Sequence, residues 1–354
     1  MLKKKMSKNT RSNLITYGIV IVAFIVMQTL ISTGSISSLM EGLMIPLCIY
    51  IILAVSLNLV VGILGELSLG HAGFMCVGAF ASAFFSKCMR DVITIAPLRF
   101  FLALLIGVAV AAVFGIIIGI PVLRLKGDYL AIVTLAFGEI IKNLVNVLFI
   151  GKDSNGFHFS TKDVMDLNME ADGTVIVNGP QGITGTPQDS TFVIGVILIL
   201  LTLFIVINMV NSRDGRAIMA IRDNRIAAES VGINVTKYKL MAFTVSAALA
   251  GAAGVLYAHN LSTLTANTNN FGYNMSINIL VFVVLGGIGS IRGSMIAAVV
   301  LTLLPELLRG LSDYRMLIYA VVLIIMMLFN WSPKAIEWRE KYLSFGKKKK
   351  EAVK

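Results

Sequence analysis

The residues of this chain that could do chemistry are polar groups set among long apolar runs. The three histidines, His71, His158 and His259, lie far apart, and no HExxH or GxSxG spacing accompanies them. No GxxxxGKS or GxxxxGKT phosphate loop occurs, so the chain cannot bind ATP through that motif. The sequence therefore predicts no catalytic residues, no metal site and no cofactor within this chain.

Glycines, a carboxylate and a histidine interrupt the apolar run from Leu57 to Phe74. A straight helix facing lipid would not tolerate this, because backbone groups freed at a break need neighbouring helices or water. We therefore expect a break or re-entrant bend in the protein interior, which serves either a substrate path or close helix packing through small residues. The candidate path and hinge residues here are Asn58, Gly62, Gly65, Glu66, Ser68, Gly70, His71 and Gly73.

A second glycine-rich break lies between Leu285 and Gly293. Its spacing is not GxGxxG and no strand is expected before it, which argues against a phosphate loop. Glycine-interrupted segments in two parts of a membrane protein are typical of a transporter's central site. The candidate residues of this break are Gly286, Gly287, Gly289 and Ser290.

Polar side chains also follow one face of the expected fifth span. Glu139, Lys142, Asn143 and Asn146 are spaced i, i+3, i+4 and i+7, which stacks them along a helix. Intramembrane charges usually face the bundle interior and pair with each other. Glu139 and Asn143 are therefore candidates for substrate passage, and the alternative is a Glu139–Lys142 pair that only locks helices together.

The elements that must position these residues are membrane helices. Hydrophobic residues make up 57% of the chain and charged residues 14%, and several runs reach the roughly 20 apolar residues that cross a bilayer. We predict an all-α integral membrane protein of about ten transmembrane helices with glycine-rich broken or re-entrant segments. The spans are placed near residues 14–34, 40–61, 67–86, 100–120, 128–150, 191–211, 239–258, 275–288, 294–310 and 315–331.

The charges predict the orientation of these spans. With both termini in the cytoplasm, the inside segments hold 22 Lys or Arg and the outside segments 7. This gives a basic cytoplasmic N-terminus (1–13), one permease-like membrane domain (14–331) and a basic cytoplasmic tail (332–354). The alternative for the first run, a cleaved signal peptide, would leave an odd number of spans. Because the basic residues flank spans, the net charge of +11 indicates contact with membrane lipid and not with nucleic acid.

Two loops stand out in this arrangement. Residues 151–190 form an acidic extracytoplasmic loop, which we interpret as a docking surface, with a passive linker as the alternative. Residues 212–238 form a basic cytoplasmic loop with a short amphipathic helix that starts at Asp223 and ends at Gly232. Its apolar face, opposite Arg222, Arg225 and Glu229, is expected to consist of Ile226, Ala227, Ser230 and Val231.

Several segments resemble the LivM-type permeases of branched-chain amino acid ABC importers. The resemblance covers about residues 40–331 and is carried by Leu67–Gly73, Tyr129–Ile140, Gly179–Ile183, Ala220–Gly232 and Leu285–Gly293. It implies that the cytoplasmic loop is a coupling helix that docks onto an ATPase. The coupling residues are then Arg222, Asp223, Asn224, Ala227, Ala228, Glu229 and Gly232.

The resemblance also implies partners and a location. These are a homologous LivH-type permease chain, two ABC ATPase subunits that bind ATP and Mg, and an extracytoplasmic amino-acid-binding protein, in a prokaryotic cell membrane. The expected function is alternating access for Leu, Ile or Val, with importers of urea, short amides or sugars as related alternatives. An ion-coupled secondary transporter, with Glu139 as the coupling group, is the alternative outside this class.

Overall fold

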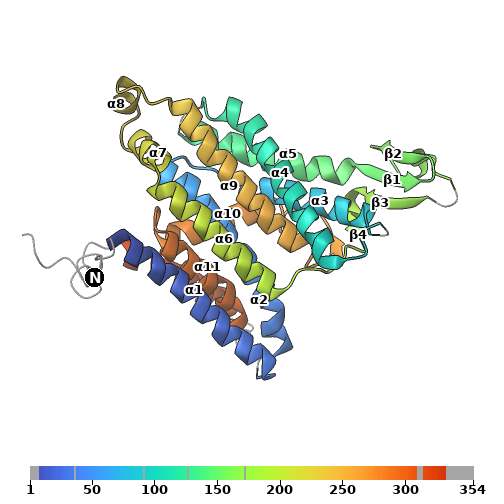
Figure 1. Ribbon diagram of the computed structural model, residues 1–354, viewed down its shortest axis with the longest axis horizontal. Helices are drawn as coiled ribbons and strands as arrows, with labels where there is room; N and C mark the ends of the chain where they lie inside the picture. The colour runs from blue at the N-terminus through green and yellow to red at the C-terminus, as the bar shows by residue number, and fades with distance from the viewer. Residues whose placement is uncertain are drawn as a thin grey trace, which may run out of the picture.

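The computed structural model describes residues 8–35, 37–90, 92–125, 127–170, 173–308 and 314–331. It shows a bundle of apolar helices with a small β insertion (Figure 1). The predicted tails, 1–13 and 332–354, lie largely or wholly outside the described residues. The helices are α1 (Lys8–Ser32), α2 (Ser38–Asn58), α3 (His71–Cys88), α4 (Ala96–Val122), α5 (Asp128–Val147), α6 (Phe192–Asn211), α7 (Arg213–Asp223), α8 (Arg225–Ser230), α9 (Val235–Ala258), α10 (Tyr273–Gly286), α11 (Ile291–Leu307) and α12 (Arg315–Trp331).

Six helical segments among the described residues are long and apolar enough to cross a membrane, which falls short of the ten predicted spans. They are Asn13–Ser32, Ser38–Leu64, Ala96–Val122, Tyr129–Val147, Phe192–Asn211 and Val235–Ala258. The glycine-rich breaks are one reason for the difference. Helices α3 and α10 each adjoin a break, and α10, with 14 residues, rises only about 21 Å. The count of ten spans and the side of the termini remain predictions.

The expected interruptions are present in the backbone. Helix α2 passes into a π-helical segment, Leu59–Leu64, and the chain then runs without helix until α3 begins at His71. The second interruption separates α10 from α11, with positive φ at Gly287 and Gly289. The span predicted at 67–86 therefore begins as non-helical chain, and the span predicted at 128–150 ends earlier, because Phe149 already belongs to a strand.

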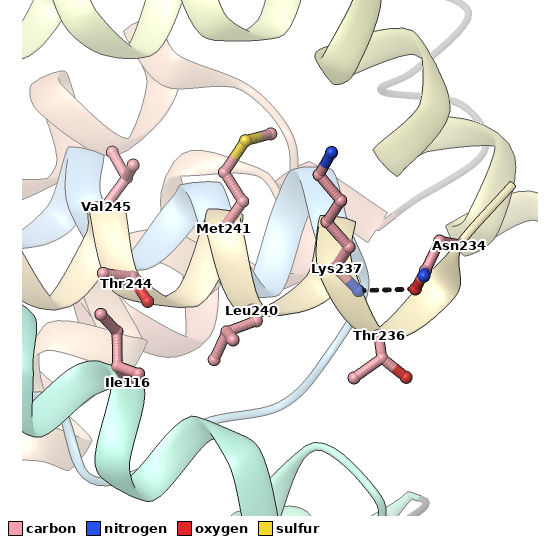
Figure 2. A pocket seen from close by; sticks show the side chains of 8 residues that line it. All are labelled: Ile116, Asn234, Thr236, Lys237, Leu240, Met241, Thr244 and Val245. Carbon is pink, nitrogen blue, oxygen red and sulfur yellow. Dashed lines mark hydrogen bonds between the residues drawn. The ribbon is translucent and has the colours of Figure 1, made fainter.

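Helix α9 lies at the centre of the bundle and packs closely on α3 and α4 through small residues. A Cβ added to Gly78 would lie 2.5 Å from Cα of Gly251, so only glycine allows these backbones to approach. Toward the start of α9, an open groove of about 620 Å³ lies beside α4 and α9. Figure 2 shows Ile116 on α4 facing Leu240 and Thr244 on α9 across this groove. No predicted path or coupling residue lines it.

The acidic insertion is folded, which corrects the all-α prediction. Strands β1 (Phe149–Asp153), β2 (Gly156–Ser160) and β3 (Thr174–Asn178) form an antiparallel sheet in the order β2-β1-β3. A second pair joins β4 (Ile183–Thr184) to β5 (Thr263–Leu264) in the loop before α10. Short 3₁₀ turns occupy Met165–Leu167 and Gly179–Gln181. Aromatic and β-branched residues around a tight turn favour strands here over a disordered linker.

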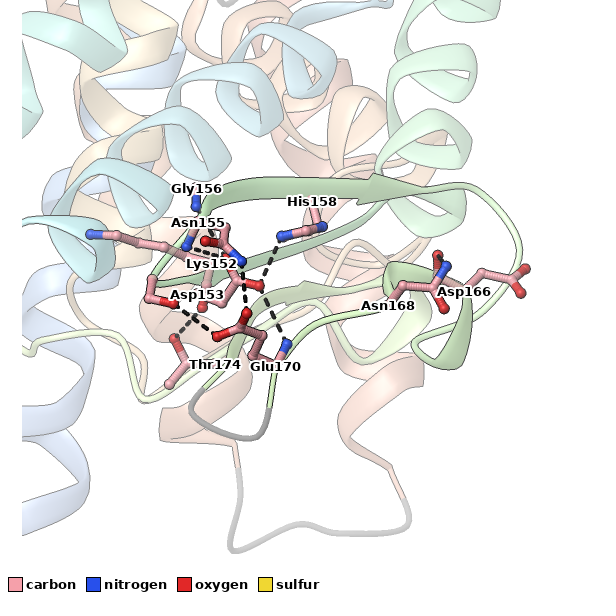
Figure 3. Close-up of polar contacts among 10 residues, drawn as sticks. Lys152, Asp153, Asn155, Gly156, His158, Asp166, Asn168, Glu170 and Thr174 are labelled. Carbon is pink, nitrogen blue, oxygen red and sulfur yellow. Dashed lines mark hydrogen bonds and ion pairs between the residues drawn. The ribbon is translucent and has the colours of Figure 1, made fainter.

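The turn between β1 and β2 is organised by Asp153 (Figure 3). Its buried carboxylate accepts hydrogen bonds from the N–H groups of Asn155 (2.9 Å), Gly156 (3.1 Å) and Glu170 (3.3 Å), and from Nε2 of His158 (2.9 Å). Burial alone would raise the pKa of this carboxyl. The hydrogen bonds from Glu170, His158 and Asn155 lower the pKa by more than burial raises it, so the pKa lies below its usual value. Asp153 therefore acts as a charged structural centre of the insertion.

The β insertion and the helix pair α7–α8 lie at opposite ends of the bundle (Figure 1). Helix α6 connects them, since it begins shortly after β4 and is followed directly by α7. Its 20 residues rise about 30 Å, the thickness of a bilayer core. The two predicted loops are thus on opposite sides of the membrane-sized region.

Candidate functional site: the helix pair α7–α8 and the interrupted helices

The helix pair α7–α8 is fixed by side-chain caps at both starts. The Ser212 hydroxyl accepts from the Gly215 N–H (3.0 Å) at the start of α7, and the Asn224 side chain accepts from the Ala227 N–H (3.0 Å) at the start of α8. Asn224, and not Asp223, is therefore the cap of α8, and Asp223 is the last residue of α7. Gly232, with φ of 84°, ends the turn after α8 as predicted.

The predicted apolar face of α8 does not pack against the bundle. Ile226 is 80% exposed and Val231 75% exposed, whereas Ala228 is 3% exposed and packs in a small cluster with Ile221 and Val235. Ala227 and Ser230 are also exposed. Because α8 has only six residues and is held at both ends, one small buried residue sets its rotation. The apolar side chains thus point outward, beside an exposed Arg225–Glu229 ion pair of 3.2 Å.

Arg222, in the last turn of α7, contacts the first interruption directly. Its Nη1 donates to the main-chain oxygen of Gly62 (3.0 Å), while Nε and Nη2 donate to Oδ1 of Asp223 (3.1 and 3.0 Å). Its aliphatic stem packs on Gly65, where an added Cβ would lie 2.5 Å from Cγ of Arg222. Gly65 has φ of 80°, a conformation that favours glycine. The predicted coupling loop and the first break therefore form one contact.

The two interruptions also contact each other. The Asn58 side chain accepts from the Gly289 N–H (2.9 Å) and donates to the Ser294 hydroxyl (2.9 Å). A Cβ on Gly62 would lie 2.3 Å from the Gly289 nitrogen. At the start of α11, the Ser290 hydroxyl accepts from the Gly293 N–H (3.2 Å). Residues separated by more than two hundred positions thus form a single junction, which brings together Asn58, Gly62, Gly289 and Ser290.

Lys239 is a site residue that the sequence interpretation missed. It lies in the first turns of α9 and forms an ion pair with Glu66, and the two side chains are 7% and 15% exposed. The signal for this role is its place at the start of an apolar span. In the sequence, Lys239 entered only the count of basic residues in the cytoplasmic segments. With Lys239 included, the first interruption is held from α7 by Arg222 and from α9 by Lys239.

The other end of the first interruption is packed tightly against neighbouring helices. Nε2 of His71 lies 2.7 Å from the Ser56 hydroxyl, and the histidine is 2% exposed. A Cβ on Gly70 would lie 2.2 Å from the Thr134 oxygen, and one on Gly73 would lie 2.7 Å from Cα of Gly138. The hydroxyl of the nearby Ser68 is buried with no hydrogen-bond partner among the described residues. The geometry at Gly70, His71 and Gly73 is that of close helix packing.

The polar face of α5 divides into two parts. Glu139 pairs with Lys142 and also accepts from the Tyr273 N–H (2.8 Å) at the start of α10. The Asn146 amide donates to the Ala266 oxygen (2.8 Å). These contacts lock α5 to the segment before α10. Asn143 does not join them and is exposed on α5.

The fold and these contacts together define a class of protein. No group of three or more His, Cys, Asp or Glu that could hold a metal occurs among the described residues. Long apolar helices with internal breaks, tied to a capped helix pair at one end, are the architecture of a multi-pass membrane permease.

The chain belongs to the family described as branched-chain amino acid transport system / permease component, whose model matches residues 39–329. It is similar to the high-affinity branched-chain amino acid transport system permease protein LivM of Salmonella typhimurium and of Escherichia coli. Each is 36% identical, over 297 and 298 residues respectively, which is 81% of this chain and 67% of those proteins. It is also 23% identical to LivH of Salmonella typhimurium over 286 residues, 79% of this chain and 88% of that protein. No solved structure matches the chain.

Proposed function

We propose that this chain is the non-catalytic permease subunit of an ATP-driven importer for Leu, Ile or Val in a prokaryotic inner or plasma membrane. The family membership and the similarity to LivM support the branched-chain substrate. ATP and Mg bind to separate ATPase subunits, and an extracytoplasmic binding protein delivers the amino acid. Urea, short amides and sugars are the related alternatives that the test below includes.

The observation that carries the ATP-driven mechanism is the outward apolar surface of α8. Helix α8, capped by the Asn224 side chain, exposes Ile226, and Val231 directly after the helix is also exposed, at the end of the bundle opposite the β insertion. Exposed apolar side chains on a rigid element are suited to a protein partner. We assign this surface to the ATPase, so α7–α8 receives the motion of the ATPase pair. The ends of the bundle then follow: α7–α8 is cytoplasmic and the β insertion extracytoplasmic.

The substrate path is proposed along surfaces that a second permease chain covers. Asn143 on α5 and Asn278 on α10 are exposed although they lie within apolar helices, and an amide facing hydrocarbon is costly. The similarity to both LivM and LivH, each named for the same transport system, supports a homologous chain as the cover. Alternating access then moves the two interruptions relative to that surface.

The test is uptake into proteoliposomes that contain both permease chains, both ATPases and the binding protein. Leucine uptake is expected to require ATP and to stop when the phosphate-loop lysine of the ATPase is replaced. Competition by Leu, Ile and Val, with urea and ribose as contrasts, tests the substrate class. ATP-independent uptake driven by an ion gradient would instead support a secondary transporter. Glu139 is a poor coupling group for that alternative, because Lys142 and the Tyr273 N–H already occupy its carboxylate.

A further inference from the structure

The first interruption ends a long helix whose last carbonyl groups lack backbone partners, and a side chain of α7 donates a hydrogen bond to one of them. The π-helical segment ends at Leu64, and Gly65 turns the chain away with φ of 80°. The last carbonyls of the segment, including that of Gly62, therefore lose the amides that a continued helix would supply. Arg222 donates to the Gly62 oxygen from outside the helix (3.0 Å). A cation at a helix C-terminus also interacts favourably with the helix dipole.

A second cation holds the residue that follows the turn. Glu66 pairs with Lys239 of α9, and both side chains are largely buried. Residues 62–66, which we name the α2 exit turn, are therefore bonded to two positive side chains, Arg222 of α7 and Lys239 of α9. Arg222 can hold two partners at once because its planar fork reaches Gly62 with Nη1 and Asp223 with Nε and Nη2. A lysine offers no such fixed geometry.

The opposite side of the α2 exit turn touches the second interruption. Gly62 lies against Gly289, and Asn58, one helical turn earlier, accepts from the Gly289 N–H (2.9 Å). Gly289 has φ of 82°, in a turn whose geometry depends on glycine. A displacement of the exit turn therefore has to move the turn between α10 and α11 or break its hydrogen bond to Asn58.

We propose that Arg222 and the Glu66–Lys239 ion pair form a latch on the α2 exit turn, which converts movement of α7 into movement of both interruptions. Arg222 and Lys239 are positioning residues for transport in this scheme, since they act through residues 62–66. The inference rests on the proposed function, because it requires that the ATPase moves α7–α8. It adds the route by which that motion reaches the interior.

The experiment compares variants of the full reconstituted importer by the ratio of leucine transported to ATP hydrolysed. In complexes that assemble with the ATPases, Arg222→Gln is expected to lower this ratio about tenfold, within the range typical of coupling between two sites. Arg222→Lys, which keeps the charge without the fork, should give an intermediate ratio. Arg216→Gln is the matched control, because Arg216 is also exposed on α7 but, among the described residues, donates only to the nearby Asn211 oxygen (3.2 Å).

A wild-type ratio in Arg222→Gln would overturn the latch, as would an equal fall in the Arg216→Gln control. Arg222→Lys keeps the test valid if Arg222→Gln does not assemble: a wild-type ratio in an assembled Arg222→Lys importer also contradicts the latch. Failure of the proposed function looks different. In that case the unmodified importer takes up leucine without ATP, or its ATPases do not co-purify with the permease at all.

Discussion

Replacing Gly62 by alanine tests the junction of the two interruptions most sharply. The added Cβ would lie 2.0 Å from Oδ1 of Asn58 and 2.3 Å from the Gly289 nitrogen, whereas ordinary contact begins near 3.4 Å. The two segments would have to separate by more than 1 Å, which breaks the hydrogen bond between Gly289 and Asn58. Overpacking costs about 1–3 kcal/mol, and leaving buried polar groups unpaired costs about 1–3 kcal/mol more. We expect Gly62→Ala to lower the free energy of unfolding by about 2–6 kcal/mol in total.

Gly42→Ala is the matched control for this prediction. Gly42 lies on the same helix, α2, with nothing within 4 Å of an added Cβ. Alanine there should be neutral or stabilising by up to about 1 kcal/mol, from helix propensity alone.

The chain's own thiols provide the assay. Cys48 and Cys76 are free and 2% and 0% exposed, so a thiol-reactive fluorescent dye reports their exposure on heating the purified chain, while the partly exposed Cys88 sets the baseline. Gly62→Ala should unfold several degrees below the wild type and Gly42→Ala should not. Equal unfolding temperatures for Gly62→Ala and the wild type would refute the packing of the two interruptions on each other.

Two further predictions follow from the charged pairs. Glu66→Gln and Lys239→Met should each lower the free energy of unfolding by about 3–5 kcal/mol, because each leaves a buried charge unpaired. The double variant should lose clearly less than the sum of the two single losses. Strictly additive losses in the same thiol assay would contradict the Glu66–Lys239 ion pair. The carboxylate of Asp153 has a pKa below its usual value, so its contribution to stability is present above the unfolded-state pKa, near 4, and is lost as the pH falls through the lower folded-state value. Limited proteolysis of the insertion should therefore show that the resistance of the wild type persists below pH about 4. The Asp153→Asn variant should be cleaved readily, with little change over that pH window. If the variant and the wild type had the same dependence on pH, the result would count against the network around Asp153.

The sequence predicted the local features of this fold well. Clusters of glycine predicted the positions of both interruptions, and long apolar runs predicted the long helices. Both kinds of feature depend mainly on residues that are close together in the sequence. Gly232 was also predicted correctly as the end of the turn after α8, since a positive φ there needs glycine.

Features that depend on distant contacts could not be predicted from one sequence. Periodicity gave the segment an apolar face but not the side that faces the bundle, which is set by burial of Ala228 against Ile221 and Val235 and leaves Ile226 exposed. The contact between Gly62 and Gly289 carries no local signal, because each glycine is explained by its own turn. The strands of the insertion were missed because they are short and polar residues surround them.

In the proposed function, motion from the ATPases enters this chain at α8. The most direct test of this is a single cysteine at Ile226, in a chain whose three native cysteines are replaced, within membranes that hold the complete importer. We predict that Ile226→Cys cross-links to an ATPase subunit in the complete importer and that, in vesicles without the ATPases, it reacts with a membrane-impermeant maleimide only when the vesicles are inside-out. Labelling in right-side-out vesicles, or no cross-link to an ATPase in the assembled importer, would contradict the account.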